Sequence, residues 1–495
     1  MTGLDRRNFI RTSALAGGAI LAPSMLGLIS CSDPTSPAGS ADLRRAGKGK
    51  GGYGGLTPYA KLNGIISLPL GFEATILSTA GDPMVGGTVP NAHDGMAAFR
   101  VGRGSRGFSG NDADDAEVEV QVAGRGRSRG RLVRLVRNHE IRDVPSFNPS
   151  PFGGNAYDGV GGGGTTTLEV LVARDGRADL VQQFASLTGT YTNCAGGSTP
   201  WGSWISSEEA IPGPLDVNGV ATGWGKNHGY NFDVASDADA PVDPVPLKEM
   251  GRFDHEAVAV DPDTGYVYQT EDRTPSGFYR FRPHVRGQLA RGGALEILVV
   301  QGRPQYDTKT NQPLLSPMKV EWVTIDEPDS SDPFLASGFV YNQGFAKGAA
   351  QFARLEGCWY GDGSVFFNAT SGGNAGAGQV WQYHIRRREL QLIFESPSAS
   401  VLNAPDNICV SPRGGLVLCE DGDPTNFVRG LTTRGEIFDL VANNETGTEW
   451  AGACFSPQGR TLFVNQQGET RPLQNPGGIK GRTLAIWGPW EEGAL

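Results

Sequence analysis

The residues that could carry out chemistry in this 495-residue chain begin with the stretch NCAGGSTPWGSWISSEE, residues 193–209. It places a single thiol, Cys194, fifteen positions before the carboxylate of Glu209. The same interval separates two further acidic pairs, Glu256 with Glu271 and Asp406 with Asp421. Thiolates and carboxylates bind multivalent cations, and hard oxygen ligands suit calcium or ferric iron. The recurring interval therefore indicates a metal site built from repeated elements.

Repeated hairpins are the elements that must position these residues. Four segments share an acidic or polar start, a β-rich run, a turn containing Pro or Gly and a second apolar run; they start at Glu256, Glu356, Asp406 and Ala451. Two such runs joined by a short turn predict a β-hairpin. Two less regular copies start at Asp94, with a second run ending at Glu140, and at Cys194.

Six starts predict an all-β fold, a six-bladed β-propeller with loop insertions, because radial repetition buries each sheet between its neighbours. The 72 glycines and 32 prolines favour many short strands joined by tight turns. The units are 45 to 100 residues apart, so the longer ones need insertions or extra strands.

The first strand of each propeller blade lines the central channel, so the residues that open these strands should converge near the axis. Cys194, Asp94 and the other opening acids would then share one mouth of the channel. So many carboxylates cannot all ionise without compensation; either several are protonated or cations lie among them, and a multivalent metal is the simpler account. The predicted ligands are Cys194, Glu256, Glu356, Glu209, Asp421, Asp406, Glu140 and Glu271.

These residues also have structural interpretations. An acid that opens a strand is often a solvated turn residue, and only the recurrence in register favours a ligand. Cys358, Cys409 and Cys454 occupy matching places inside strands, which is typical of small buried hydrophobes. A disulfide between Cys409 and Cys419 is left open.

Two other function classes find no support in the composition or the motifs. The chain has 43 basic and 53 acidic residues, a net charge of −10, which argues against a nucleic-acid partner. No His/Ser/Asp hydrolase pattern appears in the sequence, so serine-nucleophile chemistry is unsupported.

His93, His139 and His255 each precede an acid of the predicted cluster, and strand alternation would point them away from the metals.

The first 31 residues predict export. DRRNFIRTSALAGGAILAPSMLGLISC has paired arginines, Arg6 and Arg7, before an interrupted apolar run, which is typical of a twin-arginine (Tat) signal rather than a spanning helix. Its end, LISC, predicts a lipobox with Cys31 as the lipidated residue; the alternative is a soluble Tat substrate cleaved nearby. Residues 32–57 would be a flexible tether and residues 58–495 the propeller. We therefore expect the Tat translocase as a partner during export, and a protein of the periplasm, outer membrane or cell surface.

Several motifs, in this order, resemble the PhoX family of bacterial alkaline phosphatases: RNHE, NCAGGSTPWGSWISSEE, GRFDHEAVAVDP, FARLEG, APDNICVSPRGGLVLCEDG and GACFSPQGRTLFVNQ. The resemblance runs from about Asn91 to Gln467. It implies a Tat-exported six-bladed propeller that hydrolyses phosphomonoesters at a cluster of ferric iron (Fe3+) and calcium (Ca2+) ions in its central channel.

The resemblance also implies residue roles. Cys194 falls on the family's iron-binding cysteine, Glu256 and Glu356 on carboxylate ligands, and Arg354 on the arginine that contacts phosphate. Calcium ligands are implied at Glu209 and Asp421. The sequence departs from the family pattern after Phe463, where VNQQGET replaces Asn-x-Gln-His-Pro-Gly, and this leaves the contribution of the final unit open.

The implied chemistry suits these residue types. A phosphomonoester is a dianion whose transition state spreads charge over its equatorial oxygens, so cations and a guanidinium stabilise it. Arg354 lies two residues before Glu356, and strand alternation would place both on one face. The alternative for Arg354 is a simple ion pair with a neighbouring acid.

Two other functions are weighed against the phosphatase. A calcium-dependent propeller hydrolase of the gluconolactonase or regucalcin type could use Glu256 and Asn407, but it gives Cys194 and Arg354 no task. A non-catalytic surface propeller would use calcium only as a brace. For the phosphatase we expect small-molecule phosphomonoesters as partners, a monomer, and contact with the membrane only through an N-terminal lipid.

Overall fold

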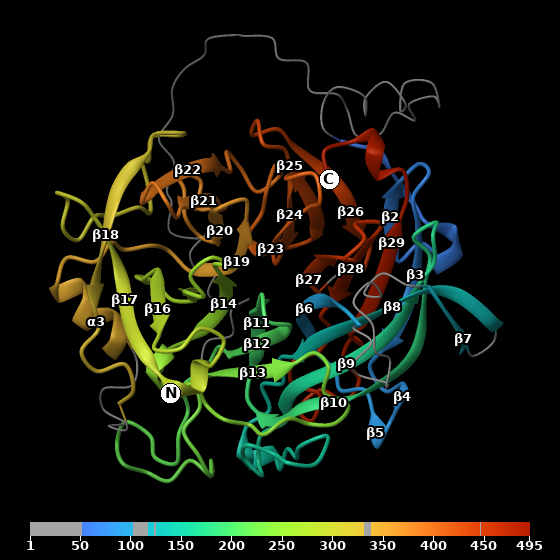
Figure 1. Ribbon diagram of the computed structural model, residues 1–495, viewed down its shortest axis with the longest axis horizontal. Coiled ribbons are helices and arrows are strands. Elements are labelled where there is room, and N and C mark those ends of the chain that lie inside the picture. The colour runs from blue at the N-terminus through green and yellow to red at the C-terminus, as the bar shows by residue number, and fades with distance from the viewer. Residues whose placement is uncertain (1–51, 102–116, 123–124, 331–337, 446) are drawn as a thin grey trace. The chain divides into compact units, whose positions relative to one another are not determined.

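The regular secondary structure of the computed structural model consists almost entirely of antiparallel strands around a central axis (Figure 1). The structure describes residues 52–101, 117–122, 125–330, 338–445 and 447–495, which all belong to one compact unit, residues 41–495. The predicted export signal, Cys31 and most of the predicted tether lie outside these ranges. In them, α3 (Phe339–Ala346) is the single α-helix. No described helix has the length and apolar character needed to cross a membrane.

The strands follow one another as runs of antiparallel neighbours. The first run contains β6 (His93–Arg100), β8 (Gly126–His139), β9 (Gly163–Val172) and β10 (Ala178–Thr190), with β7 (Val118–Val122) beside β8. The second contains β11 (Asn193–Ser198), β12 (Ser203–Glu208) and β13 (Asn231–Ala235). The third contains β14 (His255–Val260), β15 (Val267–Glu271), β16 (Tyr279–Pro283), β17 (Gly293–Val300) and β18 (Met318–Thr324).

Three more runs complete the ring. They are β19 (Leu355–Gly361), β20 (Ser364–Ala369), β21 (Gln379–His384) and β22 (Glu389–Glu395); β23 (Pro405–Val410), β24 (Leu416–Glu420), β25 (Phe427–Leu431) and β26 (Ile437–Asn443); and β27 (Trp450–Phe455), β28 (Thr461–Gln466) and β29 (Arg482–Trp487). Each of the six predicted hairpins is present as a pair of antiparallel strands.

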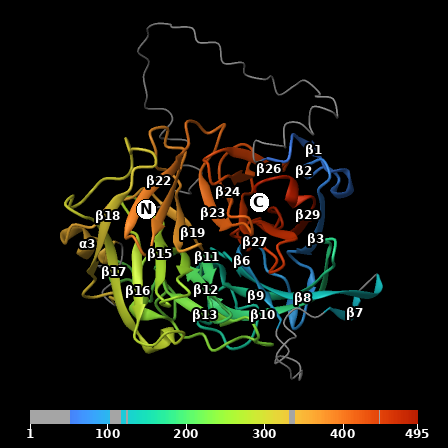
Figure 2. The same cartoon turned by 45° about the horizontal axis from the view of Figure 1, so that its top comes forward.

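The first strands of the runs surround the axis in cyclic order: β6, β11, β14, β19, β23, β27 and again β6 (Figures 1 and 2). The prediction of an all-β propeller with loop insertions is confirmed. The number of six blades stays a prediction, because hydrogen bonding does not place each of the six runs in a sheet of its own. Strand β18 joins the third and fourth runs into one nine-stranded sheet.

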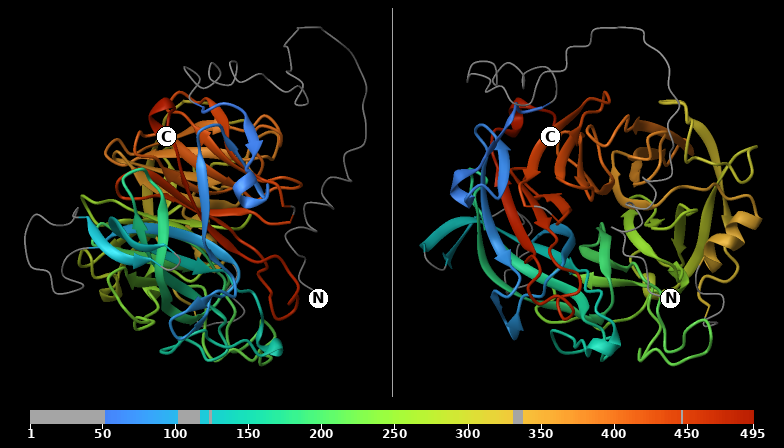
Figure 3. Two further views of the ribbon diagram at one scale, coloured as in Figure 1. Left: turned by 90° about the vertical axis from the view of Figure 1, so that its right-hand side faces the viewer. Right: turned by 180° about the vertical axis from the view of Figure 1, so that it is seen from behind.

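Strands from the two ends of the described chain close the ring. β3 (Glu73–Thr79) pairs with β29 at the outer edge of the last run (Figure 3). β1 (Leu56–Pro58) and β2 (Ile66–Pro69) extend the preceding sheet through β26. The hydroxyl of Tyr53 donates to the Trp490 carbonyl at 3.2 Å and accepts from the Leu495 N–H at 3.1 Å. Residues 52–57, which the sequence analysis assigned to the tether, are therefore part of the folded domain.

Small residues let the inner strands approach one another closely. A Cβ on Gly197 of β11 would lie 1.9 Å from the Val258 carbonyl oxygen of β14, and one on Gly452 of β27 would lie 2.4 Å from the Asp94 carbonyl oxygen of β6. Only glycine fits at such contacts. Larger side chains fill the space between neighbouring runs of strands, as in the stacked pair Phe278 and Phe367, whose ring centroids are 4.2 Å apart. This packing fixes the inner strands that carry the candidate site.

Candidate metal centre

One hydrogen bond recurs where each inner strand begins. Four residues two positions before a predicted ligand have a left-handed φ of 49° to 53°: Ala92, Thr192, Arg354 and Ala404. Their carbonyls accept, at 2.8 to 2.9 Å, the N–H groups of the residues directly after the second strands, Glu140, Glu209, Thr370 and Asp421. The other two hairpins make the same bond: the Asp272 N–H donates to the Asp254 carbonyl at 3.1 Å, and the Gln467 N–H donates to the Glu449 carbonyl at 3.2 Å. This repeated bond fixes which residues of each hairpin face the channel.

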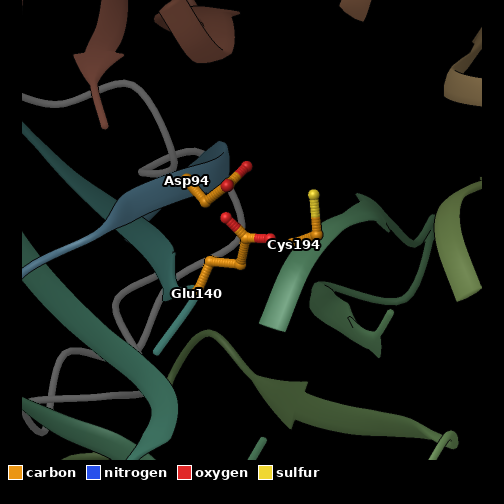
Figure 4. Close-up of side chains that lie close together, drawn as sticks. All are labelled: Asp94, Glu140 and Cys194. Atoms are coloured by element: carbon orange, nitrogen blue, oxygen red, sulfur yellow. The ribbon is translucent and has the colours of Figure 1, made fainter. Parts of the chain in front are cut away.

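The starts of the inner strands bring potential ligand atoms together in four groups, in each of which the atoms lie within 4.8 Å of one another. Figure 4 shows the first group, in which Asp94, Glu140 and Cys194 point toward a common space. The others are Cys194, Glu209 and Glu256; Glu256, Asp272 and Glu356; and Asp406, Asp421 and Glu449. Because Cys194 and Glu256 each belong to two groups, the first three groups form one continuous row.

Burial and mutual repulsion raise the pKa values of acidic groups in this row. Burial raises the pKa of Asp94 well above its usual value, and the carboxylates of Glu140 and Asp406 raise it further. Burial and the Glu356 carboxylate do the same to the pKa of Glu256. The pKa of the Cys194 thiol is raised by burial and then by Asp94. Positive charge must lie among these groups if they are to be ionised, and a donor set of carboxylate oxygens with one sulfur fits multivalent cations.

Arg354 lies at one end of the row. Its Nε donates to Asp272 Oδ1 at 2.8 Å and one Nη donates to Glu356 Oε1 at 2.6 Å. The prediction that Arg354 and Glu356 share one face of a strand needs correction, because β19 begins at Leu355 and Arg354 precedes it in a left-handed conformation. The turn still brings the guanidinium onto Glu356. Arg354 therefore is paired with acids, and it also lies beside the candidate ligands with 20% of its side chain exposed.

Arg142 lies at the other end of the row and was not among the predicted site residues. Its Nε donates to Glu140 Oε1 at 2.6 Å, and one Nη contacts both Glu140 and Glu209. The residue follows the RNHE motif by two positions in a loop, where no strand periodicity indicated the direction of its side chain. The row of candidate ligands thus has a guanidinium at each end.

The structure does not bring Glu271 into any of the four groups. Its carboxylate accepts hydrogen bonds from the Tyr279 hydroxyl at 2.7 Å and the Gly277 N–H at 3.1 Å. The neighbouring residue, Asp272, takes the predicted place beside Glu256.

Turn length explains this correction. Val260 pairs with Val267 across the β14–β15 turn, whereas Val410 pairs with Leu416 across the β23–β24 turn, so the first turn is one residue longer. A shift of one residue moves every following side chain to the opposite face of a strand. The fifteen-residue interval that correctly places Asp421 therefore places Glu271 on the wrong face.

The acids directly before the ligands Glu209, Asp272 and Asp421 bind neighbouring segments of the chain instead of facing the channel. Glu208, Glu271 and Glu420 occupy the same register position at the ends of their second strands. Glu208 accepts from the N–H groups of Tyr191 at 2.9 Å and Gly229 at 2.8 Å. Glu420 accepts, each at 2.9 Å, from the N–H groups of Asn403 and Phe427. These buried carboxylates are occupied by hydrogen bonds from nearby backbone N–H groups and, for Glu271, from the Tyr279 hydroxyl, and they belong to none of the four groups.

Polar side chains on the second strands hold the carbonyl groups of ligand residues in the next hairpin. The pairs are Asn138 to Cys194 at 2.9 Å, Thr270 to Glu356 at 2.5 Å, Asn368 to Asp406 at 3.3 Å and Asn465 to Asp94 at 2.5 Å. Each bond crosses from one run of strands to the next. Neighbouring runs are therefore fixed to one another at the level of the candidate ligands.

The final unit contributes at two places. Glu449 lies two residues before the sixth predicted start, Ala451, and belongs to the fourth group. Gln467, in the stretch that departs from the family pattern, donates to Asp94 Oδ2 at 2.9 Å. Glu449 occupies the position that is left-handed in four other hairpins, two residues before the start of the repeat. The backbone conformation is known only from the structure, so the sequence did not indicate Glu449.

The remaining cysteines and histidines do not join the groups. The described cysteines are all free and buried, so Cys409 and Cys419 are not bonded to each other. His139 lies 2.9 Å from the Asn91 carbonyl oxygen through Nδ1 and 2.8 Å from Thr166 Oγ1 through Nε2. Within the described residues, none of the four groups contains a histidine, as strand alternation predicted.

A family model and one solved structure agree with this architecture. The family model described as alkaline phosphatase PhoX matches residues 52–469. The solved structure of Pseudomonas fluorescens PhoX in complex with vanadate, a transition-state analogue, is similar at 17% identity and a TM-score of 0.62, covering 87% of this chain and 97% of that chain. A gluconolactonase from Xanthomonas campestris matches at 10% identity and a TM-score of 0.32, covering 76% and 95%. A comparison with curated protein sequences found no match.

Proposed function

Because the chain belongs to the PhoX family of alkaline phosphatases, a family of metal-dependent phosphatases, we propose that it hydrolyses small phosphomonoesters at ferric iron and calcium ions in its central channel. The observation that carries the proposal is the continuous buried row in which Cys194 and Glu256 each belong to two groups of ligand atoms. The residues of this row would hold more than one cation, because each of its groups offers three ligand atoms. When bound, such cations stabilise charge on phosphate oxygens and activate water.

The donor types favour an assignment of the ions. We assign iron to the groups that contain Cys194, because a thiolate is a soft ligand and calcium prefers oxygen. We assign calcium to the groups made only of carboxylates, Glu256, Asp272 and Glu356 and, in the fourth group, Asp406, Asp421 and Glu449. Asp94, Glu140 and Glu209 complete the groups that contain Cys194, so we assign Glu209 to iron and not to calcium, the role that the family resemblance implied.

Besides the bound cations, we propose that the side chain of Arg354 binds the substrate phosphate. A guanidinium offers a planar set of N–H donors that matches two oxygens of a phosphate. Its pairs with Asp272 and Glu356 hold it at the edge of the row, and its partial exposure leaves it accessible to a substrate. Its task would be to orient the dianion over the cations and to stabilise charge on the equatorial oxygens.

The alternatives are less favoured. A gluconolactonase-type hydrolase or a calcium-braced surface propeller leaves the buried Cys194 thiol and the paired Arg354 without a task. Neither alternative predicts iron, and family membership favours the phosphatase.

Elemental analysis and activity of the purified protein test the proposal together. We expect bound iron and calcium, a visible thiolate-to-iron charge-transfer band, and hydrolysis of p-nitrophenyl phosphate that rises with added calcium. In Cys194→Ser the band should vanish and hydrolysis should fall by at least roughly tenfold, while calcium at the all-carboxylate groups remains.

Cys409→Ser is the matched control, since Cys409 is also buried but belongs to no group of ligand atoms. It should lower stability and keep the visible band. Metal-loaded protein without phosphatase activity would refute the function, and active protein without iron would refute the assignment of Cys194.

A further inference from the structure

The two arginines at the ends of the row are placed in similar ways. Arg354 bridges Asp272 and Glu356, and Arg142 bridges Glu140 and Glu209. The acids between them belong to overlapping groups linked by Cys194 and Glu256. Each guanidinium therefore lies against candidate ligands from two different hairpins.

Arg142 is partly exposed, unlike the arginines that serve the interior. Its side chain is 23% exposed and that of Arg354 is 20% exposed, whereas the structural Arg134 is 2% exposed. Arg134 is surrounded by the Glu169 carboxylate and by backbone carbonyls. The exposed part of the Arg142 side chain leaves room for a ligand to approach it.

The main chain of Arg142 is held in place before any ligand arrives. Its N–H donates to the Thr470 carbonyl at 2.7 Å, and its own carbonyl accepts from the Tyr191 hydroxyl at 3.3 Å. The preceding carbonyl, of Ile141, accepts the Thr192 N–H at 3.1 Å, directly before the strand that carries Cys194. Arg142 is thus anchored to loops of the first, second and last runs, which reduces the entropy lost when it binds a ligand.

We propose that Arg142 is a second phosphate-contacting residue, which binds the substrate phosphate from the side opposite Arg354. This inference rests on the proposed phosphatase function. A phosphate dianion over the row would meet cations below and a guanidinium at each end, so its charge is compensated from both sides. Arginine suits this position because it stays ionised and can contact a carboxylate and a phosphate oxygen at once.

A purely structural role makes a different prediction. If Arg142 only held Glu140 and Glu209 in place for the metals, its loss would lower the iron content and weaken the visible band. If it binds phosphate, its loss leaves the metals in place and weakens the binding of inorganic phosphate itself. Metal content and phosphate affinity therefore separate the two roles.

The experiment uses the metal-loaded full chain with inorganic phosphate as the probe. Isothermal titration calorimetry, elemental analysis and p-nitrophenyl phosphate kinetics are compared for wild type, Arg142→Gln, Arg142→Lys and Arg280→Gln. Arg280 is a matched control, because it pairs with the carboxylate of Glu296 at 16% exposure on β16, away from the four groups. Arg142→Lys keeps the charge and provides a second variant if the glutamine variant does not fold.

We expect Arg142→Gln to bind phosphate at least about tenfold more weakly with unchanged iron and calcium, and kcat/KM to fall in proportion. Arg142→Lys should lose less, and Arg280→Gln should match the wild type. Unchanged phosphate affinity in both Arg142 variants, or lost metal, would overturn the inference while wild-type hydrolysis leaves the phosphatase function standing. A wild type that neither binds nor hydrolyses phosphate compounds would overturn both.

Discussion

At the scale of single residues, neighbouring acids in this fold have opposite tasks. Glu271 accepts hydrogen bonds from Tyr279 and Gly277, whereas Asp272 lies with Glu256 and Glu356 in the row of candidate ligands. The same division separates Glu208 from Glu209 and Glu420 from Asp421. Strand alternation explains it, since successive side chains point to opposite faces.

Two acid-to-amide substitutions test this division. Asp272→Asn should reduce bound calcium and lower hydrolysis by at least roughly tenfold, because an amide is a weaker cation ligand than a carboxylate. Glu271→Gln keeps an acceptor for Tyr279 and should leave the calcium content and the visible band unchanged. Calcium analysis and hydrolysis of p-nitrophenyl phosphate measure both. Loss of calcium in Glu271→Gln with none in Asp272→Asn would show that the structural register is wrong.

At the scale of elements, the site depends on contacts between consecutive hairpins. Thr270 of β15 is fully buried, and its hydroxyl lies 2.5 Å from the Glu356 carbonyl oxygen of β19. The N–H of Ala257 in turn donates to the Thr270 hydroxyl at 3.0 Å. The side chain of Thr270 therefore links the third run to the strand that carries Glu356.

Thr270→Val removes this hydroxyl with little change in volume. We expect the free energy of unfolding to fall by about 1–3 kcal/mol, because buried carbonyl and N–H groups lose their partner. Hydrolysis should fall as well, since the backbone at Glu356 is released. Thr270→Ser restores the hydroxyl and should recover both properties. Denaturant unfolding and activity are the measurements, and a valine variant equal to the wild type in both would contradict the role of this contact.

At the scale of the whole molecule, β3 completes the sheet of β27–β29, so both ends of the described chain lie in one closed ring. Tyr53 packs against Trp490 and Leu495, which shortens the predicted tether to the residues before position 52. We propose that this tether connects the folded ring to a lipid on Cys31 after Tat export to the periplasm, the outer membrane or the cell surface.

Cys31→Ser tests the anchor independently of the chemistry. The variant should leave the membrane fraction and keep its phosphatase activity, because the four groups of candidate ligands are made of residues 94 to 449. Fractionation of cells followed by activity measurements in each fraction shows the result. A wild-type protein found wholly in the soluble fraction would reject lipidation and favour a cleaved, soluble product.

The sequence alone determined the hairpins, the propeller class and most of the candidate ligands. Apolar alternation and turn residues are local signals, and they mark the starts at Asp94, Cys194, Glu256, Glu356 and Asp406. These residues share register positions in repeated units, so the radial fold brings them together. The motifs also led to the PhoX family before any contact was known.

Only the tertiary structure decided the rest of the site. A turn one residue longer moves Asp272 into the row and Glu271 out of it, and spacing along the chain does not reveal strand register. Glu449 and Arg142 lie before a strand and in a loop, where no periodicity indicates the direction of a side chain. Glu449 meets Asp406 and Asp421 of the preceding run, and Arg142 contacts Glu209 of the second run as well as its near neighbour Glu140, so both positions depend on packing between segments far apart in the sequence.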